Sequence, residues 1–160
     1  MKSCTEQLDI LKVGDAMSPV KFTISPVQKL DSVAKLFQQN GIDAASVVDE
    51  TGKCVGILTN CDLVRFQAEL PEVSSHIGGG MSFEAEHRNS DGSLELVAHP
   101  FDEVQRHMTR CLQTIDLFST LRLATTIMRE QRIHHLIVLD DAQRPIGILS
   151  SLDILTKLDG

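Results

Sequence analysis

The chain has 160 residues, of which 42% are apolar, and this length and composition are typical of a soluble globular protein with one domain or two small ones. Its net charge of −7 argues against a nucleic-acid polymer as partner, because neutralising phosphates requires a basic face. Since the sequence lacks the apolar core of a signal peptide and any run of about 18 apolar residues, we expect a cytoplasmic protein with no membrane partner, whose four cysteines stay reduced.

The sequence contains an internal duplication. A shift of 91 positions aligns residues 13–62 with residues 104–153 without a gap, and 12 of these 50 positions are identical. Unrelated segments of this length would share only about 3 identical positions. The most similar stretches are GILTNCD at residues 56–62 and GILSSLD at residues 147–153. One structural unit is therefore expected to occur twice.

The first copy predicts a helix, two strands and a second helix, in that order. Apolar residues recur on one helical face over residues 29–40, and Gly41 follows at a position typical of a helix C-terminus. The runs ASVVD and CVGIL predict buried strands on either side of a turn. A further helix is expected from about Asn60 to Glu69, and a short extended segment is expected near Thr23.

The segment between the copies has a different composition. Residues 71–99 contain three consecutive glycines and the turn-rich sequence RNSDG, next to runs that alternate weakly in polarity. This pattern predicts a linker with a surface β-hairpin. A mobile linker without regular structure is the alternative.

The second copy repeats the order of the first. A helix is expected near residues 118–131, then the strands HLIVLD and PIGIL around a turn, and a last helix that reaches about Leu158, with an extended segment near Thr114. One such unit would leave an apolar sheet face uncovered. The expected fold class is therefore mixed α/β (α+β), with repeats at residues 8–70 and 100–158 packed through their sheets with pseudo-two-fold symmetry.

The repeated heptapeptides place a hydroxyl and a carboxylate at the start of a helix. Thr59 and Asp62 in the first copy, like Ser150 and Asp153 in the second, follow a glycine and an apolar strand. The free N–H groups of a helix N-terminus favour a phosphate or a hydroxyl-rich ligand, and a carboxylate there can accept both hydroxyls of a ribose. The same spacing is that of a capping box, which satisfies the helix N-terminus without any ligand. The residues alone leave both interpretations open.

The order and spacing of several short motifs resemble those of a known family. These motifs are Val13-x-Asp15-x-Met17 with Thr23, Met108-Thr109 with Thr114, IHHLIVLDD at residues 133–141, and the two heptapeptides. Over residues 8–70 and 100–158 they resemble the CBS-domain pair, a regulatory module that is found in enzymes, channels and transporters and also as a stand-alone bacterial protein. The resemblance implies an α/β disc of two repeats with two clefts, which in many members bind an adenosine-containing ligand: AMP, ADP, ATP or S-adenosylmethionine.

The resemblance also implies which residues would bind such a ligand. In the family's pattern the hydroxyl and the Asp of each heptapeptide hold the ribose and phosphate, a threonine before the first strand lies near the nucleotide, and residues just before the second strand supply cationic groups. The residues at these positions are Thr23, Thr59, Asp62, Thr114, His134, His135, Ser150 and Asp153. No metal or other cofactor is expected, because adjacent strand histidines point to opposite faces and the cysteines lack zinc spacing.

The first copy departs from this pattern. Asp43 and Ala44 stand where the second copy has His134 and His135. At this place a phosphate would meet a repulsive carboxylate and no positive charge. Our hypothesis is that the two clefts are unequal, with one good adenylate site and the other weak or empty.

Two functions of different class follow, and the resemblance favours the first. In the first, the chain is a ligand-sensing regulatory module that binds an adenine nucleotide and passes the resulting change in packing to a separate effector protein or to its own oligomer. The resemblance to the family implies that this oligomer is a homodimer. In the second, it is a ligand-free structural or dimerisation module whose motifs are only helix caps. An enzyme is least favoured, since the sequence has no P-loop or catalytic pair, and His76, His87 and His99 are spaced irregularly in a polar segment.

Overall fold

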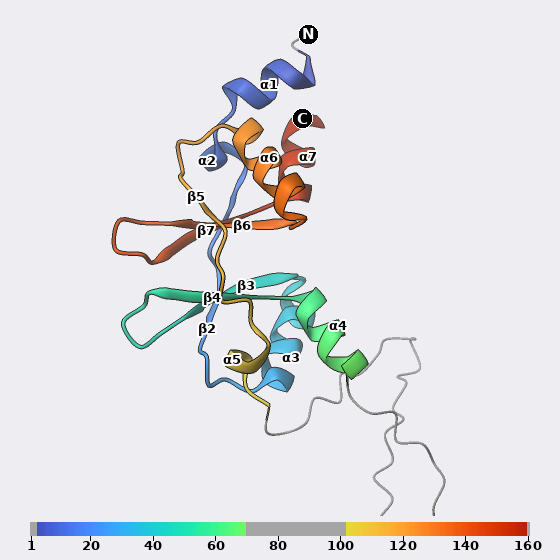
Figure 1. The fold of residues 1–160 in the computed structure, drawn as a ribbon, viewed down its shortest axis with the longest axis vertical. Coiled ribbons are helices and arrows are strands. Elements are labelled where there is room, and N and C mark those ends of the chain that lie inside the picture. The colour runs from blue at the N-terminus through green and yellow to red at the C-terminus, as the bar shows by residue number, and fades with distance from the viewer. Residues whose placement is uncertain (1–2, 70–101, 160) are drawn as a thin grey trace, which may run out of the picture.

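The computed structural model describes residues 3–69 and 102–159. Figure 1 shows two halves, one above the other, each with a small sheet that faces the sheet of the other half and with helices on its outer side. This arrangement confirms the predicted mixed α/β fold of two repeats packed through their sheets. The hairpin predicted within residues 71–99 lies outside the described residues, as do His76, His87 and His99.

The first half contains every element predicted for the first copy. Its sheet has the order β2-β3-β4, in which β2 is parallel and β4 antiparallel to β3. Two helices lie on the outer side of this sheet (Figure 1). The elements are β2 (Thr23–Ile24), α3 (Leu30–Asn40), β3 (Ala44–Val48), β4 (Cys54–Thr59) and α4 (Asn60–Glu69).

The apolar stripe and the terminal glycine explain where α3 forms and ends. Leu30, Val33 and Phe37 are buried together in the core of the first half. The helix ends at Gly41, whose φ of 60° lies in the left-handed region and whose N–H donates to the Phe37 carbonyl. The equivalent residue of the second copy is Arg132, with a φ of 53°. The second copy therefore keeps the left-handed conformation at the end of the helix, although it lacks the glycine that adopts this conformation without strain.

The second half repeats the arrangement of the first, with one strand added. Its own elements are β5 (Thr114–Ile115), α6 (Leu121–Gln131), β6 (His135–Leu139), β7 (Pro145–Ser150) and α7 (Ser151–Asp159). The strand β1 (Ser18–Pro19), from the first copy, pairs antiparallel with β7 and gives the sheet order β1-β7-β6-β5. In the first half Thr109 takes the equivalent place, through two backbone hydrogen bonds with Ile57 of β4.

The N-terminal segments of the two repeats are exchanged between the halves. The helices α1 (Cys4–Ile10) and α2 (Val13–Ala16) stand at the start of the first copy but pack on the second half, where Val13 is part of the core. The helix α5 (Val104–His107) stands at the start of the second copy, and its Val104 is buried in the core of the first half. The sequence patterns did not predict these three helices or their exchange. Each core is complete only with a side chain from the other copy.

The duplicated glycines accommodate the exchanged segments. A Cβ atom at Gly56 would lie 2.7 Å from Sδ of Met108, and a Cβ atom at Gly147 would overlap Sδ of Met17. Both methionines belong to exchanged segments, and the two Gly–Met pairs are related by the duplication. The missing side chain of each glycine therefore makes room for a methionine of the other copy.

The duplicated aspartates Asp49 and Asp140 hold the turns of the two hairpins. Oδ1 of Asp49 accepts hydrogen bonds from the N–H and the hydroxyl of Thr51. Asp140 accepts hydrogen bonds from the N–H and from Nε of Arg144. These hydrogen bonds hold the pKa of both carboxyls below the usual value for Asp. Turn formation therefore explains why this position is identical in the two copies.

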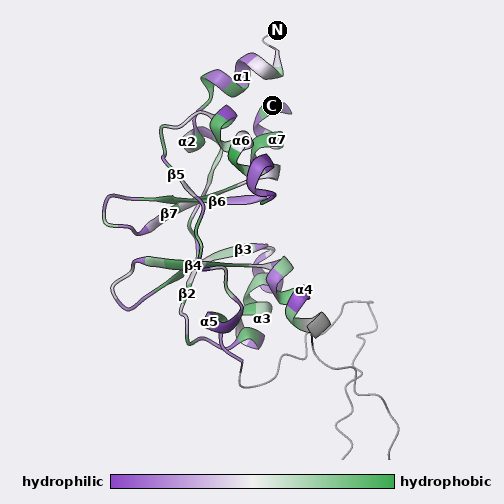
Figure 2. Ribbon diagram, viewed as in Figure 1, coloured by the Kyte–Doolittle hydropathy of each residue, from purple (hydrophilic) through white to green (hydrophobic). Residues whose placement is uncertain are grey.

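The two sheets meet through the side chains that point away from their own cores. Since side chains alternate along a strand, Ser46, Ile57 and Ile137 face the opposite half, and they are buried although they belong to neither core. In Figure 2 the strand β4 is largely in the hydrophobic colour, whereas the tips of both hairpins are purple. A hydrogen bond of 2.9 Å from the N–H of Cys54 to the carbonyl of Gln143 joins the two hairpins.

We predict that Gly56→Ala lowers the free energy of unfolding by about 1–3 kcal/mol, because the added methyl group overlaps Met108 and crowds the carbonyl of Thr109. In a Met108→Ala background the same change should cost clearly less, because the overlapping side chain is gone. Urea unfolding of the wild type, both single variants and the double variant measures this coupling. Additive costs would contradict the close approach of Met108 to Gly56.

Candidate functional site

The first candidate site lies where β4 runs into α4. Oδ2 of Asp62 accepts hydrogen bonds from the N–H and the hydroxyl of Thr59, both at 2.8 Å. In return the N–H of Asp62 donates to Oγ1 of Thr59 at 3.4 Å. These are the reciprocal contacts of a capping box, and they satisfy the N-terminus of α4 without a ligand. Asp62 is buried, with 7% of its surface exposed.

The second candidate site is formed in the same way where β7 runs into α7. Oδ2 of Asp153 accepts hydrogen bonds from the N–H and the hydroxyl of Ser150, both at 2.7 Å. The N–H of Asp153 donates to Oγ of Ser150 at 3.0 Å. Asp153 is half-buried and so more accessible than Asp62. Both heptapeptides therefore act as helix caps in the structure.

In each cap one carboxylate oxygen is used by the helix, and the other has a weaker partner. Oδ1 of Asp153 accepts a hydrogen bond of 3.2 Å from the hydroxyl of Ser18, which belongs to β1 and hence to the first copy. Oδ1 of Asp62 lies 3.8 Å from the guanidinium of Arg65, whose side chain is exposed. A helix cap and a ligand contact can therefore be made by different oxygens of one carboxylate.

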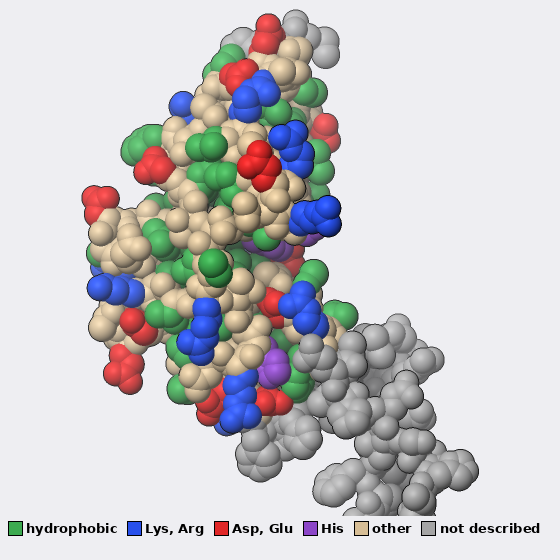
Figure 3. Space-filling model, in the orientation of Figure 1, with side chains coloured by type: hydrophobic (Ala, Val, Ile, Leu, Met, Phe, Trp, Pro, Cys, Tyr) green, Lys and Arg blue, Asp and Glu red, His purple; other side chains and the backbone are tan. Residues whose placement is uncertain are grey.

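The predicted histidines lie at the start of β6, and their surroundings differ. His135 pairs in register with Ser150 of β7, and its Nε2 lies 3.3 Å from Oδ2 of Asp43 in the other half. His134 is exposed, and its carbonyl accepts a hydrogen bond from the N–H of Ser151, the first residue of α7. Figure 3 shows histidine side chains at the seam between the two halves, with acidic side chains beside them.

The predicted threonines lie farther from the caps. Thr23 and Thr114 are exposed in β2 and β5. They pair with Ser46 of β3 and Ile137 of β6, so in each sheet a central strand separates the threonine from the strand that carries the cap. Within the part of the chain that the structure describes, neither threonine hydrogen-bonds to a cap. The structure thus brings the histidines close to a cap and leaves the threonines one strand away.

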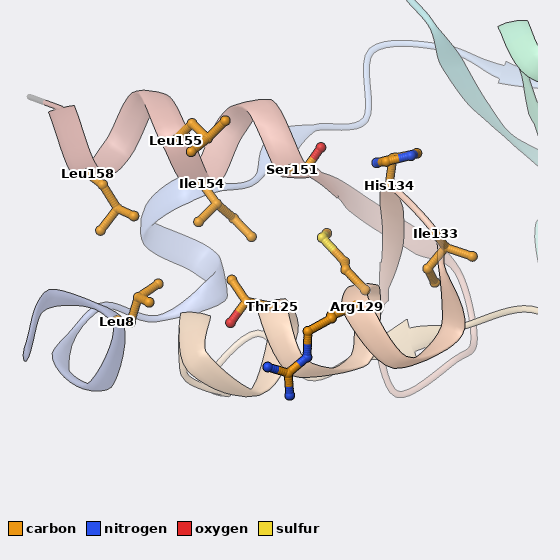
Figure 4. Close-up of a pocket in the computed structure, with 10 residues that line it drawn as sticks. Leu8, Thr125, Arg129, Ile133, His134, Ser151, Ile154, Leu155 and Leu158 are labelled. Atoms are coloured by element: carbon orange, nitrogen blue, oxygen red, sulfur yellow. The ribbon is translucent and has the colours of Figure 1, made fainter. Parts of the chain in front are cut away.

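A separate apolar hollow of about 450 Å³ opens between α1, α6 and α7 on the second half. Figure 4 shows Leu8 of α1 at one end of this hollow and His134 with Ser151 at the other. The wall between them includes Ile154 and Leu158 of α7. Among the eight predicted site residues only His134 lines the hollow, so the hollow is distinct from the two caps.

The described residues offer little metal or thiol chemistry. Within residues 3–69 and 102–159, no group of three or more His, Cys, Asp or Glu residues is placed to hold a metal ion. All four cysteines are free, and burial raises the pKa of the Cys54 thiol, which lowers its reactivity at neutral pH. In the same two ranges no helix has the length and apolar character needed to cross a membrane.

Three residues at these sites were not predicted to contact them. Arg65 follows Asp62 by three positions on a predicted helix, and this spacing alone could have indicated the ion pair. The sequence did not indicate the contact of Ser18 with Asp153, because this contact exists only through the exchange of the segment that contains Ser18. The contact of Asp43 with His135 likewise depends on how the halves pack, and the sequence showed only that a carboxylate replaces a histidine there.

A family model described as CBS domain matches residues 13–69 and again residues 102–160. The chain therefore belongs to the CBS domain family and contains a pair of these domains. It is 30% identical over 146 residues to a CBS domain-containing protein of Dictyostelium discoideum, covering 91% of this chain and 90% of that protein. It is also 27% identical to two proteins of Methanocaldococcus jannaschii, MJ1404 and MJ1232, over 81% and 94% of this chain. The chain spans only 24% and 40% of the length of these two relatives.

Solved structures of CBS domain pairs have the same fold. The CBS domain pair of protein MJ0100, in complex with 5′-methylthioadenosine and S-adenosyl-L-methionine, matches with a TM-score of 0.71 and 23% identity, over 94% of this chain and 98% of that chain. CBSX2 in complex with AMP matches with a TM-score of 0.65 and 20% identity, over 91% of this chain and 94% of that chain. At this level of identity the likeness establishes the fold.

We predict that Thr59→Ala and Ser150→Ala each lower the free energy of unfolding by about 1 kcal/mol, because each removes the hydroxyl that caps a helix. The matched variants Thr59→Ser and Ser150→Thr keep the hydroxyl and should unfold close to the wild type. Urea unfolding at neutral pH measures all four. A capping role would be refuted if the alanine variants were as stable as their hydroxyl-bearing controls.

Proposed function

We propose that this CBS domain pair is a regulatory module that binds an adenosine-containing ligand at the seam between its two repeats. The proposed ligand is AMP, ADP, ATP or S-adenosylmethionine, and the module has no catalytic role of its own. It would act in the cytoplasm. The residues proposed to line the sites are Thr23, Thr59, Asp62, Thr114, His134, His135, Ser150 and Asp153.

One observation carries this proposal: each cap leaves a carboxylate oxygen available beside a helix N-terminus. The cap uses Oδ2 of Asp62 or Asp153, whereas Oδ1 has only a long contact with Arg65 or Ser18. Ribose hydroxyls can replace these contacts at Oδ1 and leave the helix cap intact. The capping and ligand-binding interpretations are therefore compatible at the level of individual atoms.

The ligands of similar structures support the class of compound. The MJ0100 pair is in complex with 5′-methylthioadenosine and S-adenosyl-L-methionine, and CBSX2 is in complex with AMP. All three compounds contain adenosine and therefore the ribose that a carboxylate oxygen would accept. A 5′ substituent would extend toward a helix N-terminus, where the helix dipole favours polar or anionic atoms.

Contacts between the repeats support a relay of the binding event. Ser18 of the first copy contacts Asp153 of the second, and Asp43 of the first contacts His135 of the second. A ligand at either place would touch both halves, so it would shift their relative packing if its affinity differed between the two arrangements. We propose that this shift is passed to a separate effector protein or to the oligomer of the chain itself.

We predict that a saturating adenosine ligand raises the melting temperature by about 5–10 °C, because a ligand at about 100 times its Kd stabilises the folded state by about 2.7 kcal/mol. The measurement is a thermal-shift screen with AMP, ADP, ATP and S-adenosylmethionine, and with GTP as a non-adenosine control. Asp62→Asn and Asp153→Asn should each abolish the shift at one site. If the clefts are unequal as hypothesised, only one of these variants will lose most of the effect.

Asp141→Asn is the matched control, because it removes an exposed carboxylate at a hairpin tip. It should keep the full ligand-induced shift. No shift with any adenosine compound, together with aspartate variants that only melt at a lower temperature, would overturn the sensor and leave a structural module.

A second observation favours self-association. Leu152 and Leu155 of α7 are 69% and 59% exposed, and they lie three residues apart on the same helix. Leu155 also lines the apolar hollow, together with Leu8 and Ile154. Large exposed apolar side chains beside an apolar hollow are typical of protein–protein interfaces. We propose a homodimer in which α7 of each copy packs against this surface.

We predict that Leu155→Glu shifts the chain toward a monomer, because it places a charge in the centre of the proposed apolar contact. Analytical ultracentrifugation over a concentration series measures the change. Val27→Glu is the control, since Val27 is 62% exposed and lies in the loop before α3. A wild type that stays monomeric at every concentration would refute this dimer.

A further inference from the structure

The carboxylate of Asp43 lies where the two proposed sites meet. The carbonyl of Asp43 accepts a hydrogen bond of 2.9 Å from the N–H of Asn60, the first residue of α4, so Asp43 adjoins the first cap. Its Oδ2 lies 3.3 Å from Nε2 of His135. His135 pairs in register with Ser150, which belongs to the second cap. Asp43 therefore adjoins the first cap through its backbone, and its carboxylate contacts the histidine that pairs with Ser150 of the second cap.

The duplication places side chains of opposite character at this position. The equivalent of Asp43 in the second copy is His134, whose carbonyl accepts the N–H of Ser151 at 3.0 Å in the same manner. The side chain of His135 is only 15% exposed, whereas that of Asp43 is 69% exposed. The imidazole of His135 thus already faces a carboxylate. The exposed partner of this contact, and therefore the group that an incoming ligand meets first, is the carboxylate.

We propose that Asp43 makes the seam select adenosine compounds with a neutral or cationic 5′ substituent, such as a thioether or a sulfonium, over adenosine phosphates. This inference rests on the proposed function and narrows the ligand class given there. It follows from the position of this carboxylate at the seam, on a residue that adjoins the first cap and in contact with the histidine that pairs with Ser150.

Electrostatic repulsion is the physical reason for this selection. While Asp62 or Asp153 holds the ribose, a 5′ phosphate at the adjacent helix N-terminus would approach Asp43 as a further negative group. A contact between the phosphate and Nε2 of His135 would require the displacement of Asp43. A thioether avoids the repulsion, and a sulfonium gains Asp43 as a counter-ion. Because Asp43 is largely exposed, the expected effect is on the order of tenfold in Kd and weakens with salt.

The test is isothermal titration calorimetry of the purified chain with AMP, 5′-methylthioadenosine and S-adenosylmethionine at low ionic strength. The wild type should bind the two sulfur compounds on the order of tenfold more tightly than AMP. Asp43→Asn should tighten AMP binding by about the same factor and weaken S-adenosylmethionine binding a few-fold, because it removes one negative charge at nearly constant shape.

Two controls separate charge from shape. Asp43→Glu keeps the carboxylate, and Asp141→Asn removes an exposed carboxylate from a hairpin tip, so both should keep the wild-type order of preference. Thermal melts of each variant without ligand verify folding. If the wild type binds AMP as tightly as S-adenosylmethionine, or if Asp43→Asn leaves their ratio unchanged, the selection is overturned while the proposed function stands. If none of the three compounds binds the wild type or Asp43→Asn, the proposed function fails and this inference fails with it.

Discussion

The rest of the structure depends on one constraint, which is that the two repeats exchange their N-terminal segments. Val13 completes the core of the second half, and Val104 completes the core of the first. In each exchanged segment a methionine fills the space that a glycine of the other copy leaves open. A single repeat would lose both this core residue and the cover over its inner sheet face. The two halves are therefore held in a fixed relation, with their sheets and hairpins facing each other.

The same exchange determines which side chains reach the candidate sites. Because β1 crosses to lie beside β7, Ser18 contacts the oxygen of Asp153 that the helix cap does not use. Because the sheets face each other, Asp43 reaches His135 across the seam. A site built on these contacts would include residues of both copies, which is why we propose that ligand binding is coupled to the packing of the halves. This is the physical basis for proposing a sensor.

A few side chains that differ between equivalent positions make the two candidate sites chemically unequal. Asp43 corresponds to His134, so a carboxylate side chain in one copy corresponds to an imidazole in the other. Ser46 corresponds to Ile137, so one half has a buried hydroxyl at the seam where the other has an aliphatic side chain. Oδ1 of Asp62 faces the guanidinium of Arg65, whereas Oδ1 of Asp153 accepts a hydrogen bond from a serine hydroxyl. The backbone symmetry of the duplication therefore does not imply two sites of equal affinity.

The sequence by itself determined the local elements, because periodic apolar faces, strand runs and turn residues act over short distances. It predicted α3, α4 and the two hairpins, the pairing of two repeats, and the spacing by which Thr59 and Asp62 cap a helix. It could not predict α2 and α5, since helices of four residues are too short to show an apolar period. Only the tertiary structure decided that Val13 enters the other core and that Asp43 meets His135, 92 positions away. Such contacts depend on how two finished halves pack, and local propensity carries no information about that packing.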